Sequence, residues 1–422
     1  MLYTSKGGID ASLTEAELTE LTQKALSKLG RRKKVLILPP DYSRIASQAG
    51  IMAKAAFDHY GDKVKDIMPA IGTHLPMSRD EIARMYPGLP HSLFREHNWR
   101  GDVKTLGRVP ADFIEKTSGL KLGFDWPAQV NRMLVDGGHD LILSIGQVVP
   151  HEVAGMANYN KNIFIGTGGV EAINKSHYLG AAYGLERIMG RSDTPVRRVL
   201  NYASEQFTST LPIIYIQTVV AADENGVLKV RGIFIGDDAE CFEKAAQLSR
   251  RVNITTLKKR VKRIVVYLPE DKFRSTWIGN KAIYRSRLAI EDGGELFVIA
   301  PGIKTFGEDH EIDRLIRKYG YRSTEEIIEA VKSNNDLYSN LATAAHLIHS
   351  AGEGRFSINY AAGGLSSAEI EGVGYNSFDL EAAEKLFNPQ KHAPGFNVDA
   401  DGEEFYLIKN AAIGLWSAGE LK

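Results

Sequence analysis

The distribution of apolar residues predicts alternating strands and helices in the first 150 residues. Short apolar runs indicate buried strands at residues 33–38, 66–71 and 141–145. A short turn follows each run, and Ser78 and Glu81 have the spacing of a capping box at the start of a helix. Such strand–turn–helix alternation is typical of a parallel, doubly wound α/β sheet.

The later pattern predicts a hairpin and a second domain. Two alternating runs, 211–220 and 227–234, are joined by Asp223-Glu224-Asn225-Gly226, which is a strong hairpin signal. Further elements are expected as a helix over 239–250, strands over 264–268 and 295–300, and a helix over 323–333.

These patterns favour two α/β domains. Residues 1–258 are expected to form the larger N-terminal domain, with a mostly parallel doubly wound sheet that carries catalysis and cofactor binding. Residues 259–422 are expected to form a smaller C-terminal domain whose last helix packs back on the first. The active site is expected in the interdomain cleft, because ligands of open α/β sheets bind beyond the carboxyl ends of the strands.

Composition narrows the class of partner. The 422 residues hold 52 Lys and Arg against 52 Asp and Glu, so nothing indicates nucleic acid or an anionic membrane. A small-molecule partner is the better expectation. The chain has no apolar run of about 20 residues, and its first thirty residues lack the apolar centre of a signal peptide, so a cytoplasmic location is expected. The single Cys241 excludes an internal disulfide and every CxxC-type zinc site.

Chemistry-bearing side chains follow the three predicted N-terminal strands. Asp41 and Arg44 come after the first strand, His74 after the second and His151 after the third. A lone histidine at a strand end is more often a hydrogen-bonded structural group than a catalyst. Two histidines at equivalent strand ends favour function, because a reaction that handles protons on opposite faces of one carbon needs such a pair.

Other candidates have a weaker independent case. Lys161 offers an amine and His177 an imidazole, although exposed lysines are common and one histidine does not define a metal site. Residues 166–169, Gly-Thr-Gly-Gly, offer backbone N–H groups to a phosphate, but a simple turn explains them better. Arg44 could bind an anion or close a turn with Asp41.

Three further residues are expected to be structural. His346 and His349 lie in an apolar helix-like run, and Cys241 has no local sign of activation. The sequence contains no Walker A motif, dinucleotide fingerprint, HExxH motif or nucleophile elbow.

Taken together, these residues resemble the nickel-pincer-nucleotide enzymes typified by lactate racemase. No single motif is specific, but their order and spacing cover both expected domains. The matching pieces are Asp41-x-x-Arg44, Gly72-Thr73-His74, Pro150-His151-x-x-x-Gly155, Lys161, His177, and Lys281-Ala282 twelve residues before Gly293-Gly294.

The resemblance implies a cofactor and roles for the candidate residues. The cofactor would be the nickel adduct of pyridinium-3,5-bisthiocarboxylic acid mononucleotide, attached covalently at Lys161, with His177 as the protein ligand of nickel. His74 and His151 would be the paired acid/bases, while the C2 hydrogen of a 2-hydroxy acid leaves as hydride and returns to the other face. The implied binding residues are Asp41, Arg44, Gly168 and Gly169 for the cofactor, and Arg44, Lys281 and Trp277 for the substrate.

The chain also departs from the family pattern. Ile278 stands where many members have glutamine three residues before the lysine, and residues 156–160 replace a run of small residues. These departures favour a longer sugar acid such as gluconate over lactate. The expected partners are a small 2-hydroxy acid and cofactor-biosynthesis proteins, with no nucleic acid and no membrane.

Two other functions fit the same residues. A metal-dependent hydrolase would use His74, His151 and His177 as direct ligands. A non-catalytic protein that binds a sugar acid or nucleotide would use the histidines only as hydrogen-bonding groups.

Overall fold

The structure is a computed structural model that describes residues 1–223, 226–409, 411 and 414–421. It contains two compact units, residues 1–176 with 189–253 and residues 177–188 with 254–422. These units describe packing rather than independent folding, so the domain boundary expected at residue 258 stays a prediction. Among the described residues, no helix is both long and apolar enough to cross a membrane.

The first unit is built on a six-stranded sheet with the order β1-β10-β9-β6-β2-β3. Strands β9, β6, β2 and β3 are mutually parallel, whereas β10 and β1 continue the sheet in antiparallel fashion. The expected mostly parallel sheet is confirmed. The strands are β1 (Leu2–Gly7), β2 (Val35–Leu38), β3 (Val64–Ile67), β6 (Leu141–Gln147), β9 (Ile213–Ala222) and β10 (Leu228–Gly236).

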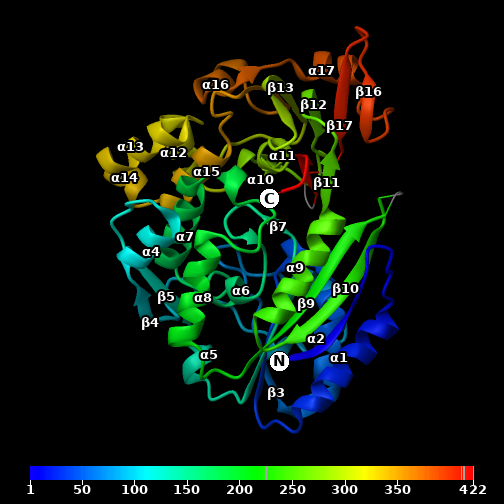
Figure 1. The fold of residues 1–422 in the computed structure, drawn as a ribbon, viewed down its shortest axis with the longest axis vertical. Coiled ribbons are helices and arrows are strands. Elements are labelled where there is room, and N and C mark those ends of the chain that lie inside the picture. The colour runs from blue at the N-terminus through cyan, green and yellow to red at the C-terminus, as the bar shows by residue number, and fades with distance from the viewer. Residues whose placement is uncertain (224–225, 410, 412–413, 422) are drawn as a thin grey trace. The chain divides into compact units, whose positions relative to one another are not determined.

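Helices cover both faces of this sheet, as a doubly wound fold requires. On one face, α1 (Glu15–Leu29) and α2 (Ala49–Tyr60) bury apolar side chains against alternate residues of β2 and β6. On the other face, α9 (Ala239–Asn253) crosses β9 and β10, and Gln217 of β9 donates to the Cys241 sulfur at 3.1 Å. Figure 1 shows α9 in front of the β9–β10 hairpin.

Smaller elements complete the first unit. They are η1 (Tyr42–Ser47), η2 (Gly61–Lys63), α3 (Arg79–Met85), η3 (His91–Leu93), β4 (Val103–Val109), α4 (Ala111–Ser118), β5 (Trp126–Asn131), α5 (Met133–Asp136), β7 (Pro150–His151), β8 (Gly155–Met156), α6 (Asn160–Phe164) and α8 (Pro195–Phe207). Helix α7 (Val170–Tyr183) begins in the first unit and continues into the second.

One strand is shorter than its apolar run suggests. Residues 66–71 were expected to form the second strand, but β3 ends at Ile67. Pro69 has no backbone N–H, and Pro39 and Pro40 lie opposite it just after β2, so the regular ladder stops. Pairing persists beyond it as single bonds, including the Ala70 N–H to the Pro39 carbonyl at 2.8 Å.

Other local expectations are confirmed. The Ser78 hydroxyl accepts from the Glu81 N–H, and the Glu81 carboxylate accepts from the Ser78 N–H, which closes the capping box of α3. Strands β9 and β10 pair as the expected antiparallel hairpin. Glu224 and Asn225 of its expected turn lie outside the described residues.

The second unit has its own six-stranded sheet, in the order β15-β14-β13-β12-β17-β16. Every pair is parallel except β16 with β17. Its strands are β11 (Ile254–Leu257), β12 (Val261–Tyr267), β13 (Ile290–Ala300), β14 (Phe356–Ala362), β15 (Asn376–Ser377), β16 (Gly395–Val398), β17 (Glu404–Ile408) and β18 (Leu415–Ala418), with β11 and β18 paired separately.

The helices of the second unit flank this sheet. They are η4 (Leu185–Arg187), α10 (Thr276–Gly279), α11 (Lys281–Ser286), α12 (His310–Tyr319), α13 (Thr324–Ser333), α14 (Asn335–Tyr338), α15 (Leu341–His349), α16 (Ser367–Gly372) and α17 (Leu380–Phe387). The last helix, α17, buries Ala383 and Phe387 against Val265 and Phe297 of its own unit. Its expected packing on the first domain stays a prediction.

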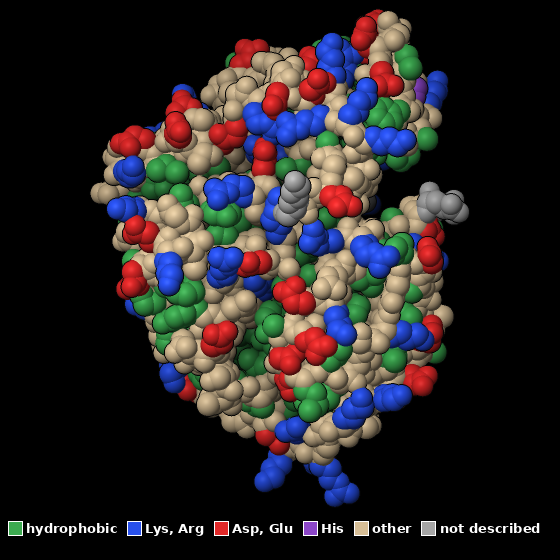
Figure 2. All heavy atoms as spheres, in the orientation of Figure 1, with side chains coloured by type: hydrophobic (Ala, Val, Ile, Leu, Met, Phe, Trp, Pro, Cys, Tyr) green, Lys and Arg blue, Asp and Glu red, His purple; other side chains and the backbone are tan. Residues whose placement is uncertain are grey.

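Charged side chains are mixed on the surface. On the face shown in Figure 2, Lys and Arg are interspersed with Asp and Glu, in keeping with a formal net charge of zero.

Candidate active site

The candidate site of the first unit lies at the carboxyl edge of three adjacent parallel strands. Strand β2 pairs with β3 on one side and β6 on the other. Asp41 and Arg44 follow β2, His74 follows β3 and His151 follows β6. These three strands are therefore neighbours in the sheet.

His74 is hydrogen-bonded to Asp41. The His74 Nδ1 lies 2.6 Å from the Asp41 Oδ2, and the Ser43 hydroxyl donates to the other carboxylate oxygen. Burial opposes ionisation of Asp41, but the bond and charge of His74 outweigh it and hold the carboxyl pKa below its ordinary value. An ionised carboxylate only accepts, so Nδ1 carries a proton. The neutral ring then has its lone pair on Nε2, and the side chain is 62% exposed.

His151 has the opposite hydrogen-bond polarity. Strands β7 and β8 form a short hairpin, inside which the Val153 N–H donates to the His151 Nδ1 at 3.1 Å. Because a backbone N–H only donates, the neutral ring of His151 carries its proton on Nε2. The side chain is 8% exposed, and the Glu152 carboxylate lies 3.8 Å from Nδ1.

Lys161 lies on α6, which is anchored to the end of β2 and to the middle of β6. The neighbouring Asn162 amide donates to the Ser144 hydroxyl at 2.9 Å and to the Leu38 carbonyl at 3.4 Å. Burial and the nearby Arg44 guanidinium lower the pKa of Lys161 to about 8, although Glu152 acts in the opposite direction. At pH 7 about a tenth of the amine is therefore neutral, against about 1 in 3000 at its ordinary value.

Backbone contacts tie the turn of His74 to the helix of Lys161. The Gly72 N–H donates to the Gly166 carbonyl at 2.9 Å, and the Gly166 N–H donates to the Lys161 carbonyl at 3.1 Å. These contacts place the two segments side by side at the strand edge.

The glycines between α6 and α7 are needed for close packing. A Cβ on Gly168 would lie 1.9 Å from the Phe164 carbonyl oxygen, and one on Gly169 would lie 2.6 Å from the Gln129 amide oxygen. The Gly168 carbonyl is bonded to the buried His97 Nε2 at 3.0 Å. Packing thus explains these glycines, and their contact with a cofactor stays a prediction.

The remaining substrate candidates lie in the second unit. Trp277 is on α10 and Lys281 begins α11, after the carboxyl end of β12. The Trp277 ring packs 4.6 Å from the ring of His346. His346 and His349 are both buried on α15, as their apolar surroundings predict.

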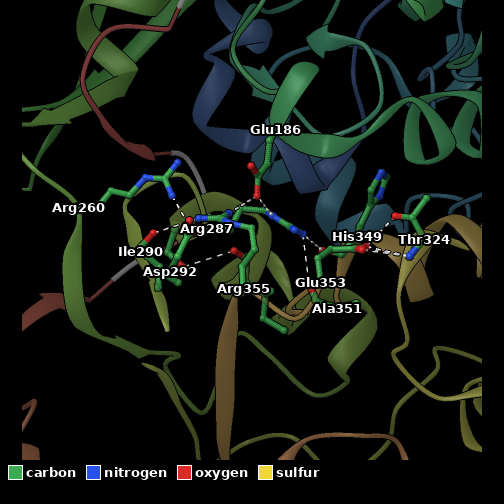
Figure 3. Close-up of polar contacts among 12 residues, drawn as sticks. Glu186, Arg260, Arg287, Ile290, Asp292, Thr324, His349, Ala351, Glu353 and Arg355 are labelled. Carbon is green, nitrogen blue, oxygen red and sulfur yellow. Dashed lines mark hydrogen bonds and ion pairs between the residues drawn. The ribbon is translucent and has the colours of Figure 1, made fainter. Parts of the chain in front are cut away.

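His177 belongs to a short segment that packs with the second unit. Helix α7 passes from one unit to the other between Ser176 and His177. Nine residues beyond His177, Glu186 accepts hydrogen bonds from Arg287 Nε at 3.2 Å and from Arg355 Nη1. Figure 3 shows Glu186 reaching towards both guanidinium groups. This clamp holds segment 177–188, and hence His177, to the second unit.

The clamp has a buried and an exposed end. Arg287 is buried and also donates to the His349 and Ala351 carbonyls, while Arg355 continues to Asp292 at 2.8 Å. Asp292 is 69% exposed and also binds Arg260. Figure 3 shows the whole network.

Replacing Glu186 by glutamine should lower the free energy of unfolding by about 1–3 kcal/mol, because buried Arg287 loses a charged acceptor. Urea unfolding, with hydrogen exchange of residues 177–188, measures the effect. Asp292→Asn is the matched control, since water screens this exposed pair and its loss should change stability much less. Equal effects of the two variants would contradict the clamp.

The sequence did not reveal several of these partners. The His74–Asp41 bond and the Glu186 clamp join residues 33 and 101 or more positions apart, and no spacing rule connects them. Within the part of the chain that is described, no three His, Cys, Asp or Glu side chains cluster as a metal site.

Comparison with known proteins identifies the N-terminal part. Residues 9–184 match the model of the family described as the lactate racemase N-terminal domain. These residues are similar to a lactate racemase N-terminal domain. The candidate residues Asp41, Arg44, His74, His151 and Lys161 all lie within the lactate racemase match, as does His177.

Solved structures share the fold over nearly the whole chain. A Thermotoga maritima protein from a structural genomics programme has a TM-score of 0.82 at 23% identity, covering 98% of this chain and 100% of that one. The lactate racemase apoprotein from Thermoanaerobacterium thermosaccharolyticum has a TM-score of 0.70 at 14% identity, covering 98% and 94%. A comparison with curated protein sequences gives no match.

Proposed function

We propose that this chain is a racemase or epimerase that inverts C2 of a 2-hydroxy acid. The relationship of residues 9–184 to lactate racemase favours this reaction. The observation that carries the proposal is the composition of one strand edge. It presents an amine with a pKa of about 8 together with two histidines of opposite hydrogen-bond polarity.

The two histidines divide the proton transfers. His74, with its lone pair on Nε2, accepts the proton of the substrate hydroxyl in one direction of the reaction. His151, with its proton on Nε2, donates to the oxygen after the opposite face has been reduced. Asp41 keeps the His74 ring in this tautomer and stabilises the imidazolium that forms. Inversion then needs no carbanion beside a carboxylate.

A nickel-pincer nucleotide at Lys161 would supply a site that accepts hydride from C2 and returns it. The residues present fit its attachment, because a neutral amine has the lone pair that acyl transfer requires. Arg44 supplies a cation beside Lys161 for an anionic group of the cofactor. In this proposal Asp41, Gly168 and Gly169 also contact the cofactor, and His177 is the nickel ligand.

The substrate is proposed to be a sugar acid such as gluconate. Ile278 and Trp277 give α10 apolar side chains beside Lys281, whose ammonium group suits a carboxylate, as does Arg44. The Trp277 ring, packed on His346, offers a flat surface to the C–H groups of a polyhydroxy chain. The proposal also includes a cytoplasmic location and delivery of the cofactor by its biosynthesis proteins.

A substrate panel tests the reaction. The protein, co-expressed with cofactor-making enzymes, is incubated with lactate, malate, phenyllactate and gluconate, each deuterated at C2, and inversion is followed by NMR. We expect inversion of gluconate with most of the deuterium kept, because hydride returns to the carbon it left. Inversion of none of the four acids, or washout of the label into water, would contradict the proposal.

A further inference from the structure

The segment that leads into Lys161 has a strained backbone. Asn158 and Tyr159 have φ values of 67° and 59°, in the left-handed region that side chains other than glycine rarely adopt. Each such residue costs about 1–3 kcal/mol, so the surroundings must enforce the conformation. Because α6 begins at Asn160, this turn decides where Lys161 points.

A buried arginine on α8 donates several hydrogen bonds to this turn. Arg197 donates to the Met156 carbonyl at 2.7 Å, to the Asn158 carbonyl at 3.3 Å and to the Asn160 side-chain oxygen. Its guanidinium packs 4.3 Å from the ring of Phe242. All three acceptors therefore belong to the five residues that precede Lys161.

Arg197 is itself held firmly. It is 2% exposed, and α8 begins just before it, where the Thr194 hydroxyl caps the Arg197 N–H at 3.1 Å. Among the described residues no carboxylate lies within ion-pair distance of its guanidinium. Burial of a cation costs free energy, which its hydrogen bonds to this turn must offset.

The same helix makes a second set of contacts to the turn. The Asn160 side-chain amide donates to the Asn201 side-chain oxygen at 2.7 Å and to the Ser204 hydroxyl at 3.2 Å. Both groups lie on α8, so the start of α6 is fixed by side chains of one helix.

We propose that Arg197 is a positioning residue, which holds residues 156–160 in the left-handed turn and thereby presents the Lys161 amine at the strand edge. The role rests on the proposed function, in which that amine carries the cofactor. Arg197 does not touch the reacting atoms and acts through the turn.

Charges around Lys161 make the role measurable. Arg44 and Arg197 lower the pKa of the amine, Glu152 and Asp41 raise it, and burial is the largest influence. Loss of Arg197 removes one cation and loosens the turn that keeps the amine buried. Both changes raise the Lys161 pKa.

Competitive labelling of the cofactor-free protein with acetic anhydride, read by peptide mass spectrometry from pH 6 to 11, gives the pKa of Lys161. Arg197→Gln should raise this pKa and so lower labelling at pH 8, by about fivefold for each rise of one unit near that pH. Arg197→Lys keeps the charge but not the three-way fork, so it should restore labelling only in part. Arg198→Gln, on the next residue and exposed, should leave the pKa unchanged.

Two results would overturn the inference. One is a folded Arg197→Gln variant in which the Lys161 pKa is unchanged. The other is an Arg197→Lys variant in which labelling of Lys161 equals that of the wild type, because the charge of Arg197 alone would then explain its effect. If Arg197→Gln does not fold, Asn160→Ala decides, since it removes one acceptor of the fork and should shift the pKa in the same direction. The labelling needs no cofactor, so a shifted pKa in a protein that never takes up a cofactor would contradict the proposed function alone.

Discussion

Replacing Lys161 by methionine should abolish covalent attachment of the cofactor and lower the rate of C2 inversion by about 10³-fold or more. Methionine is an unbranched side chain only one atom shorter than lysine, and it has no amine. Intact mass after co-expression with cofactor-making enzymes should show the cofactor on the wild type and only the bare chain for Lys161→Met. Lys104→Met, an exposed lysine paired with Asp136, is the control and should keep both mass and rate.

The same substitution should stabilise the protein. The folded pKa of Lys161, about 8, lies below its ordinary value of 10.5, so the unfolded chain binds more protons between these two pH values. The wild type therefore carries a penalty on the order of 3 kcal/mol at pH 7, which fades as the pH rises through 8 towards 10.5.

Urea unfolding at pH 7 and pH 10 checks this sign. Lys161→Met should be more stable than the wild type at pH 7, and the difference should shrink at pH 10. An inactive variant that is more stable is typical of a residue kept for function. If Lys161→Met still gained the cofactor's mass and kept its activity, Lys161 would not be the attachment site. If it were less stable than the wild type at pH 7, burial of the charged amine would not destabilise the protein.

The strands that could be predicted from the sequence are those whose side chains are buried on both faces of the sheet. Residues 35–38 and 141–147 are almost uninterrupted apolar runs, and such runs indicate strands in the middle of a parallel sheet. Strand β1 has no such run, since Leu2–Gly7 is half exposed and lies at the antiparallel edge. Its strand conformation depends on pairing with β10, more than 220 residues away, which local pattern does not show.

The candidate site was predictable in position but not in its contacts. His74 and His151 stand out because strand ends meet at one edge of a parallel sheet. Which ring nitrogen carries the proton depends on Asp41 for His74 and on the Val153 N–H for His151. These contacts come from the folded structure and not from the spacing of residues in the sequence.

The role of Arg197 could not be predicted from the sequence either. Thr194-Pro195 is a helix-start signal in the sequence, yet nothing local distinguishes Arg197, which is buried, from Arg198, which is exposed. Only the packing of α8 against the turn before α6 separates these two arginines.

The pairing of His74 with Asp41 leads to the second large effect. Asp41→Asn should lower C2 inversion about 10²–10⁴-fold while the mass added at Lys161 is kept. An asparagine amide can donate to Nδ1, which would move the ring proton to Nε2 and remove the base. The measurement is the rate of inversion on protein whose cofactor content has been checked by intact mass.

The chain supplies a matched control for this variant. Asp66 is also bonded to a histidine, with its Oδ2 2.9 Å from the His139 Nε2, but His139 is buried away from the strand ends and Asp66 also binds Arg95. Asp66→Asn should therefore lower stability and leave the rate per folded molecule within about threefold of the wild type.

Substituting the histidines completes the test. His74→Gln and His151→Gln should each lower inversion about 10²–10⁴-fold in both directions, because every turnover uses one ring as base and the other as acid. Equal losses in the two directions are required, since a racemase cannot change the equilibrium between its substrates. If Asp41→Asn were as active as Asp66→Asn, the carboxylate would not set the tautomer of His74, and the division of roles between the two histidines would be wrong.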